Sequence, residues 1–348
     1  MSRRQIVFVT CFLGIVSILL PVFSGHVSTA QQPEKTIRVG IIGLDTSHVI
    51  AFTRILNDPN PAEDVAGCRV VAAYPKGSPD IASSVSRVPG YTQQIQQMGV
   101  RIVDSIEQLV AEVDAVLLET NDGRPHLEQA VPVLRARRPM FVDKPVAGTL
   151  ADAVALYQLA AKYDTPVFSS SSLRYLEGAQ QARQGQWGKV VGCDTYSPCS
   201  LEPTHPDLFW YGIHGVEALF SVMGTGCRSV SRTHSPGTDV VVGLWEGGRV
   251  GVFRGIRQGK SGYGGTVYAE KEIVPLGPYP GYRPLVVEIV KFFRTGQAPV
   301  AAQETLEIYA FMEAADESKR RGGEPVSIQE VMERAAREAQ HRIAAVDR

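Results

Sequence analysis

The sequence predicts an α/β protein in which a doubly wound parallel sheet is followed by an α+β domain with an open, mainly antiparallel sheet. Two observations support this prediction. Up to residue 170, short and continuously apolar segments alternate with helical patterns, as expected where helices cover both faces of a parallel sheet. Beyond residue 170, valine-rich segments are separated by turn sequences such as EGG, which is typical of antiparallel strands.

Six segments of the first domain, most of them rich in valine or isoleucine, are predicted strands. They cover residues 36–42, 68–74, 100–103, 114–120, 139–143 and 165–170. Clear helical patterns lie between them at residues 126–138 and 150–163. The first strand leads into GLDTSH, residues 43–48, after which a further helix is expected. The order of strand, turn and helix predicts a ligand crevice at the carboxyl ends of these strands.

The second domain is expected to contain strands first and helices last. Strand patterns cover residues 189–197, 228–234, 239–255 and 265–276, and helical patterns cover residues 283–295, 302–320 and 328–345. The chain is therefore divided into three parts: a signal peptide at 1–30, a dinucleotide-binding type of domain at 36–170, and an α+β domain with C-terminal helices at 171–348.

The N-terminus has the pattern of an export signal. Arg3 and Arg4 precede an almost continuously apolar segment at residues 6–23, and cleavage is expected after Ala30. This pattern predicts that the protein is exported and is periplasmic or otherwise extracytoplasmic. The arginine pair fits the twin-arginine route and the general secretory route about equally, and an uncleaved anchor is a third possibility.

Composition narrows the classes of partner. The net charge is −1 and no block of like charges occurs, so neither nucleic acid nor an anionic membrane surface is an expected partner. Four cysteines follow the signal, and their sparse spacing predicts buried free thiols rather than a disulfide scaffold or a zinc ribbon. These cysteines are Cys68, Cys193, Cys199 and Cys227.

Three stretches resemble the glucose–fructose oxidoreductase/inositol dehydrogenase/MocA (Gfo/Idh/MocA) family. They are MFVDKPVAGTLADAVALYQLAAKYDTPVF, YGIHGVEALFSVMGTG and YRPLVVEIVKFFRTGQAPV. The resemblance covers roughly residues 36–328. It implies a Rossmann-like first domain, NAD or NADP as the cofactor, a small carbohydrate-like substrate, and a homo-oligomer formed through the sheet of the second domain.

The glycine motif of the first turn departs from that family. Gly43 matches the first glycine, but Asp45 and His48 occupy the other two glycine positions. A carboxylate near the expected pyrophosphate would repel it, whereas the Thr46 and Ser47 hydroxyls and the following helix would attract it. Alternatively, Asp45 caps that helix and turns its charge away from the ligand.

Three further residues are predicted to contact the cofactor. Lys76, after the second strand, is placed to pair with a 2′-phosphate, although a solvated loop lysine explains it equally well. Glu119 and Asn121 follow the fourth strand, in the crevice where ligands gather in open α/β sheets.

The resemblance also implies the catalytic residues. Lys144 matches the lysine of the family's E-K-P motif, with Asp143 in place of the glutamate, and would hydrogen-bond the substrate hydroxyl beside the nicotinamide. It is therefore also a predicted cofactor-binding residue. His214 matches the histidine of the second-domain motif and is the expected general base. Glu217 would orient its imidazole, while Trp210 replaces the first acid of that motif.

The stretch SPCSLEPTHPDLFWYGIHG, residues 197–215, is interpreted as a substrate loop. Its spacing matches no standard metal motif, so no metal ligands are assigned. The predicted substrate-binding residues are Arg174, His205, Asp207, Trp210, Tyr211 and Glu217. Two functions remain open: an exported NAD(P)-dependent oxidoreductase acting on a hydroxyl of a sugar, sugar derivative or glycoside, and a non-redox, carbohydrate-binding descendant of the same fold.

Overall fold

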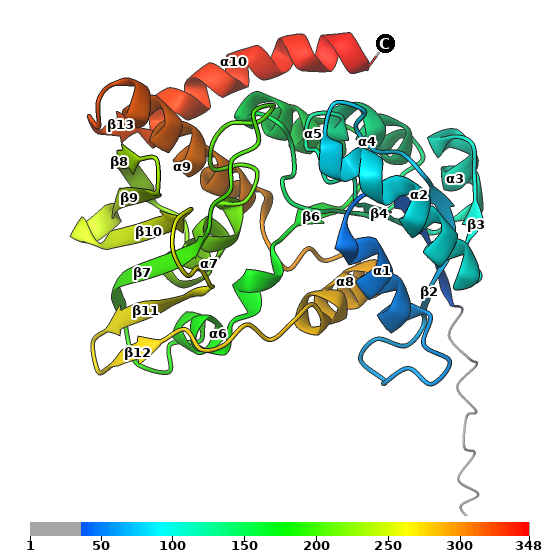
Figure 1. Cartoon of the computed structure of the whole chain (residues 1–348), viewed down its shortest axis with the longest axis horizontal. Coiled ribbons are helices and arrows are strands. Elements are labelled where there is room, and N and C mark those ends of the chain that lie inside the picture. The colour runs from blue at the N-terminus through cyan, green and yellow to red at the C-terminus, as the bar shows by residue number, and fades with distance from the viewer. Residues whose placement is uncertain (1–35, 348) are drawn as a thin grey trace, which may run out of the picture. The chain divides into compact units, whose positions relative to one another are not determined.

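A computed structural model describes residues 36–347 of the chain. Within these residues the first sheet is six-stranded and parallel, with the strand order β3-β2-β1-β4-β5-β6 (Figure 1). The strands are β1 (Ile37–Ile42), β2 (Cys68–Tyr74), β3 (Arg101–Ile102), β4 (Ala115–Leu118), β5 (Met140–Val142) and β6 (Val167–Ser169). This order is that of a Rossmann-like fold, and the ends of β1, β4 and β5 lie side by side.

Helices cover both faces of this sheet, which explains why its strands are continuously apolar. They are α1 (Ser47–Leu56), α2 (Ala82–Gln97), α3 (Ile106–Glu112), α4 (His126–Arg135) and α5 (Leu150–Lys162). For example, Ile41 and Ile42 of β1 are both fully buried, and they belong to the separate apolar cores on the two faces of the sheet. The predicted fold class is therefore confirmed for the first domain.

The second sheet is seven-stranded within the described part of the chain, with the order β12-β11-β7-β10-β9-β8-β13. Its strands are β7 (Val190–Pro198), β8 (Cys227–Ser235), β9 (Thr238–Trp245), β10 (Val250–Ile256), β11 (Gly264–Ala269), β12 (Ile273–Pro275) and β13 (Val326–Ser327). All neighbouring strands are antiparallel except β7 and β10, which are parallel. The predicted open, mainly antiparallel sheet is thus present.

The remaining helices are α6 (Glu177–Arg183), α7 (Ile213–Met223), α8 (Arg283–Thr295), α9 (Ala302–Arg320) and α10 (Ile328–Val346). Short 3-10 turns occupy Ser172–Tyr175 and Glu246–Gly248. Helix α7 is buried against the second sheet. In contrast, α8 packs into the core of the first sheet, where Phe292 meets Phe168, and α10 lies along α5 (Figure 1). The C-terminal half of the chain therefore completes the first domain.

Several expectations can be compared directly with these elements. The predicted helices at 283–295 and 302–320 coincide with α8 and α9, and all four cysteines of residues 36–347 are buried and free. Helix α2 was not predicted, because Pro89 and Gly90 lie in its middle and both disfavour a helix interior. The predicted signal peptide lies outside the described residues. None of the helices in the described part is long and apolar enough to span a membrane.

Candidate active site

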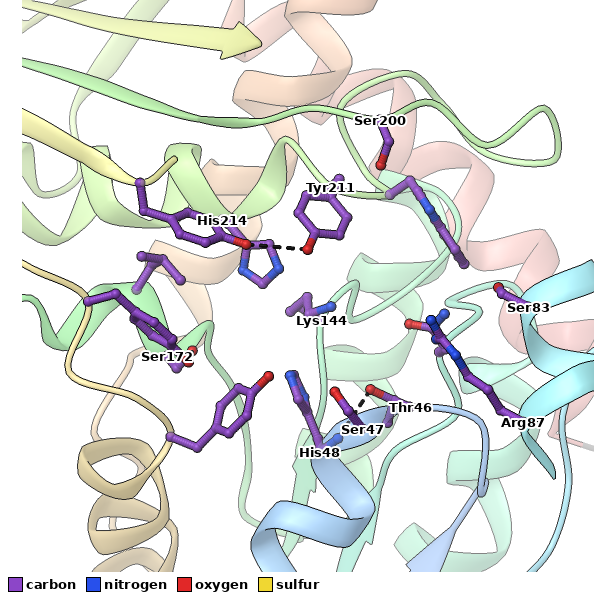
Figure 2. Close-up of a pocket in the computed structure, with 16 residues that line it drawn as sticks. Thr46, Ser47, His48, Ser83, Arg87, Lys144, Ser172, Ser200, Tyr211 and His214 are labelled. Atoms are coloured by element: carbon purple, nitrogen blue, oxygen red, sulfur yellow. Dashed lines mark hydrogen bonds between the residues drawn. The ribbon is translucent and has the colours of Figure 1, made fainter. Parts of the chain in front are cut away.

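A cavity of about 340 Å³ lies at the carboxyl ends of the first-sheet strands, which is within the usual size of a small-molecule site, roughly 300–1,000 Å³ (Figure 2). One part of its wall comes from the first domain: Thr46, Ser47, His48, Ser83, Arg87, Asn121 and Lys144. The other part comes from beyond residue 171: Ser172, Leu173, Ser200, Trp210, Tyr211, His214, Tyr263, Tyr279 and Tyr282.

The turn between β1 and α1 presents hydrogen-bond donors to this cavity. Gly43 has φ of +90°, and a side chain there would collide with the backbone of Thr120, so only glycine fits. Thr46 is the N-cap of α1, and its hydroxyl accepts the N–H of His48 at 3.4 Å. Thr46 and Ser47 both line the cavity, so the positive end of the helix faces it and favours an anion.

Asp45 does not line the cavity, nor does it cap α1. Its carboxylate is buried, and it accepts the N–H of Asn121 at 2.8 Å and the hydroxyl of Ser84 at 2.6 Å. Burial raises the pKa of Asp45, and these two hydrogen bonds limit the rise. The carboxylate therefore ties the β1 turn to the β4 loop and to α2. The predicted repulsion of a pyrophosphate does not arise from a free charge in the cavity.

Arg87 is a wall residue that the sequence analysis missed, because it lies on the unpredicted helix α2. Its guanidinium reaches the backbone carbonyl of Asp45 at 3.3 Å and faces the cavity beside Thr46 (Figure 2). A guanidinium, two hydroxyls, the amide of Asn121 and a helix N-terminus are groups that bind a diphosphate. This end of the cavity therefore fits the phosphate part of a nicotinamide dinucleotide.

Lys144 and His214 face the same space from opposite domains (Figure 2). Lys144 follows β5, where its backbone N–H donates to Oδ1 of Asp143 at 2.8 Å, and the Lys144–Pro145 bond is cis. His214 lies on α7, and its Nδ1 is 2.8 Å from the hydroxyl of Ser171. Burial and the charge of Lys144 hold the pKa of His214 well below its usual range, so the imidazole is neutral near pH 7.

The part of the wall that comes from beyond residue 171 is largely aromatic. Trp210 and Tyr211 belong to the predicted substrate loop and do line the cavity. Three tyrosines complete this wall and were not predicted, because two of them lie in loops and the third is the N-cap of α8. They are Tyr263, Tyr279 and Tyr282; the hydroxyl of Tyr263 lies 3.3 Å from that of Tyr211.

Two predicted substrate-binding residues, Arg174 and Glu217, instead form a buried ion pair. Arg174 donates to Glu217 at 2.6 Å and to Glu304 at 2.6 Å, and none of these three residues lines the cavity. Glu217 therefore does not orient His214, because its carboxylate is engaged by Arg174 and by the Ser170 hydroxyl. Ser171 is the residue that contacts the imidazole.

The polar residues of the substrate loop also point elsewhere. Nε2 of His205 lies 3.1 Å from Asp122, and its ring packs on Trp210. Asp207 accepts from Arg232 at 2.8 Å and from Lys319 at 2.6 Å. Both residues hold the loop in place, so Trp210 and Tyr211 are the two predicted substrate-binding residues of this loop that face the cavity.

Two predicted cofactor residues lie away from the cavity wall. Lys76 lines a separate cavity of about 440 Å³ at the end of β2, beside Asp80 and Arg124. Glu119 is fully buried behind the wall, close to Asp143. Thr46, Ser47, Asn121 and Lys144 are the predicted cofactor residues that do reach the cavity, and Gly43 shapes the turn behind them.

The fold and this site define an oxidoreductase with an NAD-binding Rossmann domain. Residues 37–170 match the model of the family described as the GFO_IDH_MocA oxidoreductase family, NAD-binding Rossmann fold. The first domain is therefore that of a Gfo/Idh/MocA oxidoreductase, as the sequence motifs indicated. Among curated protein sequences, none matches this chain.

Solved structures with the same fold extend over nearly the whole described chain. The scyllo-inositol dehydrogenase of Lactobacillus casei, solved with NAD(H) and scyllo-inositol, is 16% identical, with a TM-score of 0.66 over 85% of this chain and 100% of its own. The myo-inositol 2-dehydrogenase of Lactobacillus plantarum is 14% identical, with a TM-score of 0.68 over 84% and 99%. At such identities these similarities establish the shared two-sheet fold.

Proposed function

We propose that the protein is an exported oxidoreductase that uses NAD or NADP to oxidise a secondary hydroxyl of a sugar, a cyclitol or a related polyol. One observation supports this most directly. A single cavity combines an anion-binding end at Thr46, Ser47 and Arg87 with a proton-transfer pair, Lys144 and His214, and an aromatic wall. The non-redox alternative has no comparable support, because Asp45 is engaged by its neighbours and leaves the anion-binding end open.

Each end of the cavity has a separate task. When bound, the oxidised nicotinamide supplies the hydride acceptor for the substrate carbon. Lys144 donates a hydrogen bond to the substrate hydroxyl and lowers the cost of its deprotonation. Nδ1 of His214 is hydrogen-bonded to Ser171, and in the tautomer that carries its proton on Nδ1 the lone pair of Nε2 is free to accept the hydroxyl proton. The lowered pKa of His214 keeps this nitrogen available at neutral pH.

The aromatic wall favours a substrate with several hydroxyls and an apolar ring face. Trp210 and the tyrosines offer flat surfaces on which such a ring can lie, while phenol and serine hydroxyls accept and donate hydrogen bonds. The scyllo-inositol bound to the Lactobacillus casei enzyme is a molecule of this kind. A cyclitol or a pyranose is therefore the substrate class that we propose.

Two measurements test this function. The purified protein is denatured and the released material is analysed for nicotinamide dinucleotide by absorbance and mass, and calorimetry measures binding of added NAD+ and NADP+. A panel of cyclitols and sugars is then tested for formation of reduced nicotinamide. Absence of any bound or titratable dinucleotide would overturn the proposal, whereas dinucleotide binding without turnover would restrict the error to the substrate class.

We also propose that the protein assembles through the open face of the second sheet. Large apolar side chains are exposed on three neighbouring strands of this face: Val191 and Tyr196 on β7, Val242 and Leu244 on β9, and Val250 on β10. Light scattering should report an oligomer, and Leu244→Glu should shift it toward the monomer. A monomeric wild-type protein would contradict this assembly.

Export rests on the N-terminal sequence. Changing Arg3 and Arg4 together to lysine should retain unprocessed precursor inside the cell if the twin-arginine route is used. Normal processing of this variant would instead indicate the general secretory route, and an unprocessed wild-type protein in the membrane fraction would indicate an anchor.

A further inference from the structure

Glu119 is an unusual residue for a protein interior. It directly follows β4, its side chain is fully buried, and neither carboxylate oxygen has a hydrogen-bond partner among residues 36–347. Burial and the nearby carboxylate of Asp143 raise the pKa of Glu119 well above its usual range. A buried carboxyl group without a partner is costly, and such groups commonly mark a bound water or ion.

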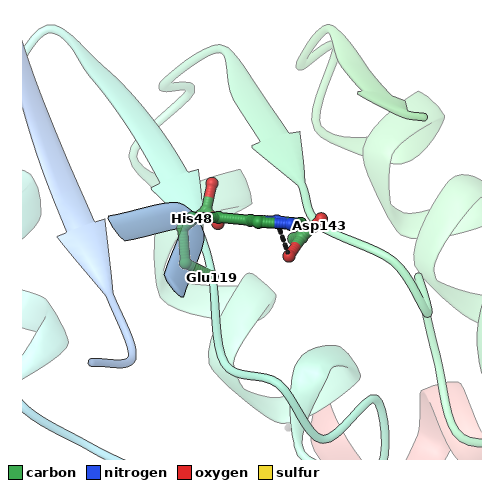
Figure 3. A group of neighbouring side chains, drawn as sticks. All are labelled: His48, Glu119 and Asp143. Carbon is green, nitrogen blue, oxygen red and sulfur yellow. Dashed lines mark hydrogen bonds and ion pairs between the residues drawn. The ribbon is translucent and has the colours of Figure 1, made fainter. Parts of the chain in front are cut away.

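Two further potential ligands lie beside Glu119 (Figure 3). Nδ1 of His48, on the first turn of α1, is 2.7 Å from Oδ2 of Asp143, which follows β5. One ligand atom from each of these three residues lies within 4.8 Å of the others. They converge because β1, β4 and β5 are neighbours in the sheet and their carboxyl ends meet at one edge.

We propose that His48, Glu119 and Asp143 bind a divalent transition-metal cation such as Zn²⁺ or Mn²⁺. One imidazole and two carboxylates form a nitrogen and oxygen ligand set that suits these ions. The site was not expected from the sequence, because its ligands come from three separate strand ends and share no motif spacing.

The surrounding charges are compatible with a cation. Oδ1 of Asp143 already accepts the N–H of Lys144, which leaves Oδ2 for the ion. The charges of Asp45, Asp143 and Lys144 all act on Glu119. When Asp45, Glu119 and Asp143 are all ionised, one divalent cation and the Lys144 ammonium together balance their three negative charges. A hydrogen bond between His48 and Asp143 alone would leave Glu119 without a partner.

The ion would lie immediately behind the cavity wall. His48 and Lys144 both line the cavity, whereas Glu119 and Asp143 are fully buried behind them. Binding would replace the hydrogen bond between His48 and Asp143 and would give the Glu119 carboxylate a partner. Because carboxylates and imidazole bind a cation in their deprotonated forms, binding should release protons and become tighter as the pH rises.

The test uses the intact protein, freed of metal with a chelator and then dialysed. Titration with Co²⁺ as a spectroscopic probe should give ligand-field absorption that saturates at one equivalent, and Zn²⁺ should displace it. Calorimetry in buffers of different ionisation enthalpy should detect the released protons. Neither readout depends on enzymatic activity or on a bound dinucleotide.

Matched variants locate the site. Glu119→Gln and Asp143→Asn should each weaken Co²⁺ binding by about a hundredfold or more, because each removes a charged ligand while keeping the shape of the side chain. Asp122→Asn is the control, since Asp122 is a buried acid of the same β4 loop that bonds Ser78 and Arg124 instead. Thermal unfolding verifies that each variant is folded.

The outcomes separate cleanly. One equivalent of Co²⁺ that is lost in Glu119→Gln or Asp143→Asn and retained in Asp122→Asn supports the site. Absence of stoichiometric binding to the wild-type protein would overturn it and leave a bound water as the partner of Glu119. Binding that persists in both ligand variants would also overturn it, because the ion would then be held elsewhere.

Discussion

Asp45 and Glu119 occupy comparable places in the first sheet but have opposite surroundings. Each follows a strand, β1 or β4, each side chain is fully buried, and burial raises the pKa of each. Asp45 receives hydrogen bonds from Asn121 and Ser84, whereas Glu119 receives none from residues 36–347. Burial alone therefore does not separate a structural acid from a ligand-binding one; the presence or absence of partners does.

The largest expected effect on activity concerns Lys144. This residue lines the cavity, and its positive charge also acts on Glu119. Lys144→Ala should lower turnover by about a hundredfold or more, because it removes both hydroxyl positioning and proton assistance. Steady-state kinetics with a substrate from the cyclitol and sugar panel measures this loss. Dinucleotide affinity, measured by calorimetry, should change far less; near-normal turnover would contradict the assigned role.

Asp45→Ala tests the structural half of the comparison. It leaves the N–H of Asn121 and the hydroxyl of Ser84 without their acceptor, so the free energy of unfolding should fall by about 2 kcal/mol. Chemical denaturation measures this change, with Asp45→Asn as a milder control that keeps one acceptor oxygen. Because the Asp45 carboxylate is held by Asn121 and Ser84 and does not face the cavity, Asp45→Gly should not tighten dinucleotide binding. Tighter binding would be expected only if this carboxylate repelled the pyrophosphate. An unchanged stability in Asp45→Ala would contradict the structural role.

In metal-free protein, Glu119→Gln should raise the free energy of unfolding, whereas Asp45→Ala should lower it. The raised pKa of Glu119 means that the folded state holds a proton which the unfolded chain loses above the ordinary glutamate range. The free energy of unfolding of the wild-type protein should therefore fall as the pH rises through that window. Glutamine removes this dependence and should stabilise the protein at neutral pH by about 1 kcal/mol. A destabilised variant with an unchanged pH slope would show that Glu119 has partners after all.

The smallest effect is confined to acid solution. Because the pKa of His214 is lower in the folded protein than in the unfolded chain, its contribution to stability is present above the ordinary histidine range. It should be lost progressively as the pH falls below that range, where the unfolded chain takes up the proton first. His214→Gln should flatten this acid slope while leaving stability at neutral pH nearly unchanged. Denaturation curves over a pH series measure the difference.

The sequence predicted the elements with strong periodicity and missed those without it. The apolar strands of the first sheet and helices α8 and α9 were found because their patterns are regular over many residues. Helix α2 was missed because packing overrides the poor propensity of Pro89 and Gly90. Arg87 was missed together with the helix that carries it.

Residues that were assigned from a family motif reach the cavity, whereas several that were assigned without knowledge of their partners do not. Lys144, His214 and Trp210 reach the cavity as expected. Arg174 and Glu217 were expected there as well, but they pair with each other, which no one-dimensional pattern reveals. The proximity of His48, Glu119 and Asp143 likewise depends on the order of strands in the sheet rather than on the order of residues in the chain.

The position of α8 and α10 affects how the chain acquires its structure during synthesis. The ribosome completes residues 36–170 long before residues 283–346, yet Phe168 is covered by Phe292 of α8, and α5 is covered by α10. A nascent first domain must therefore keep part of its apolar surface uncovered until almost the entire chain has been made. Products truncated before residue 283 would retain that surface permanently and would be substrates for chaperones and proteases.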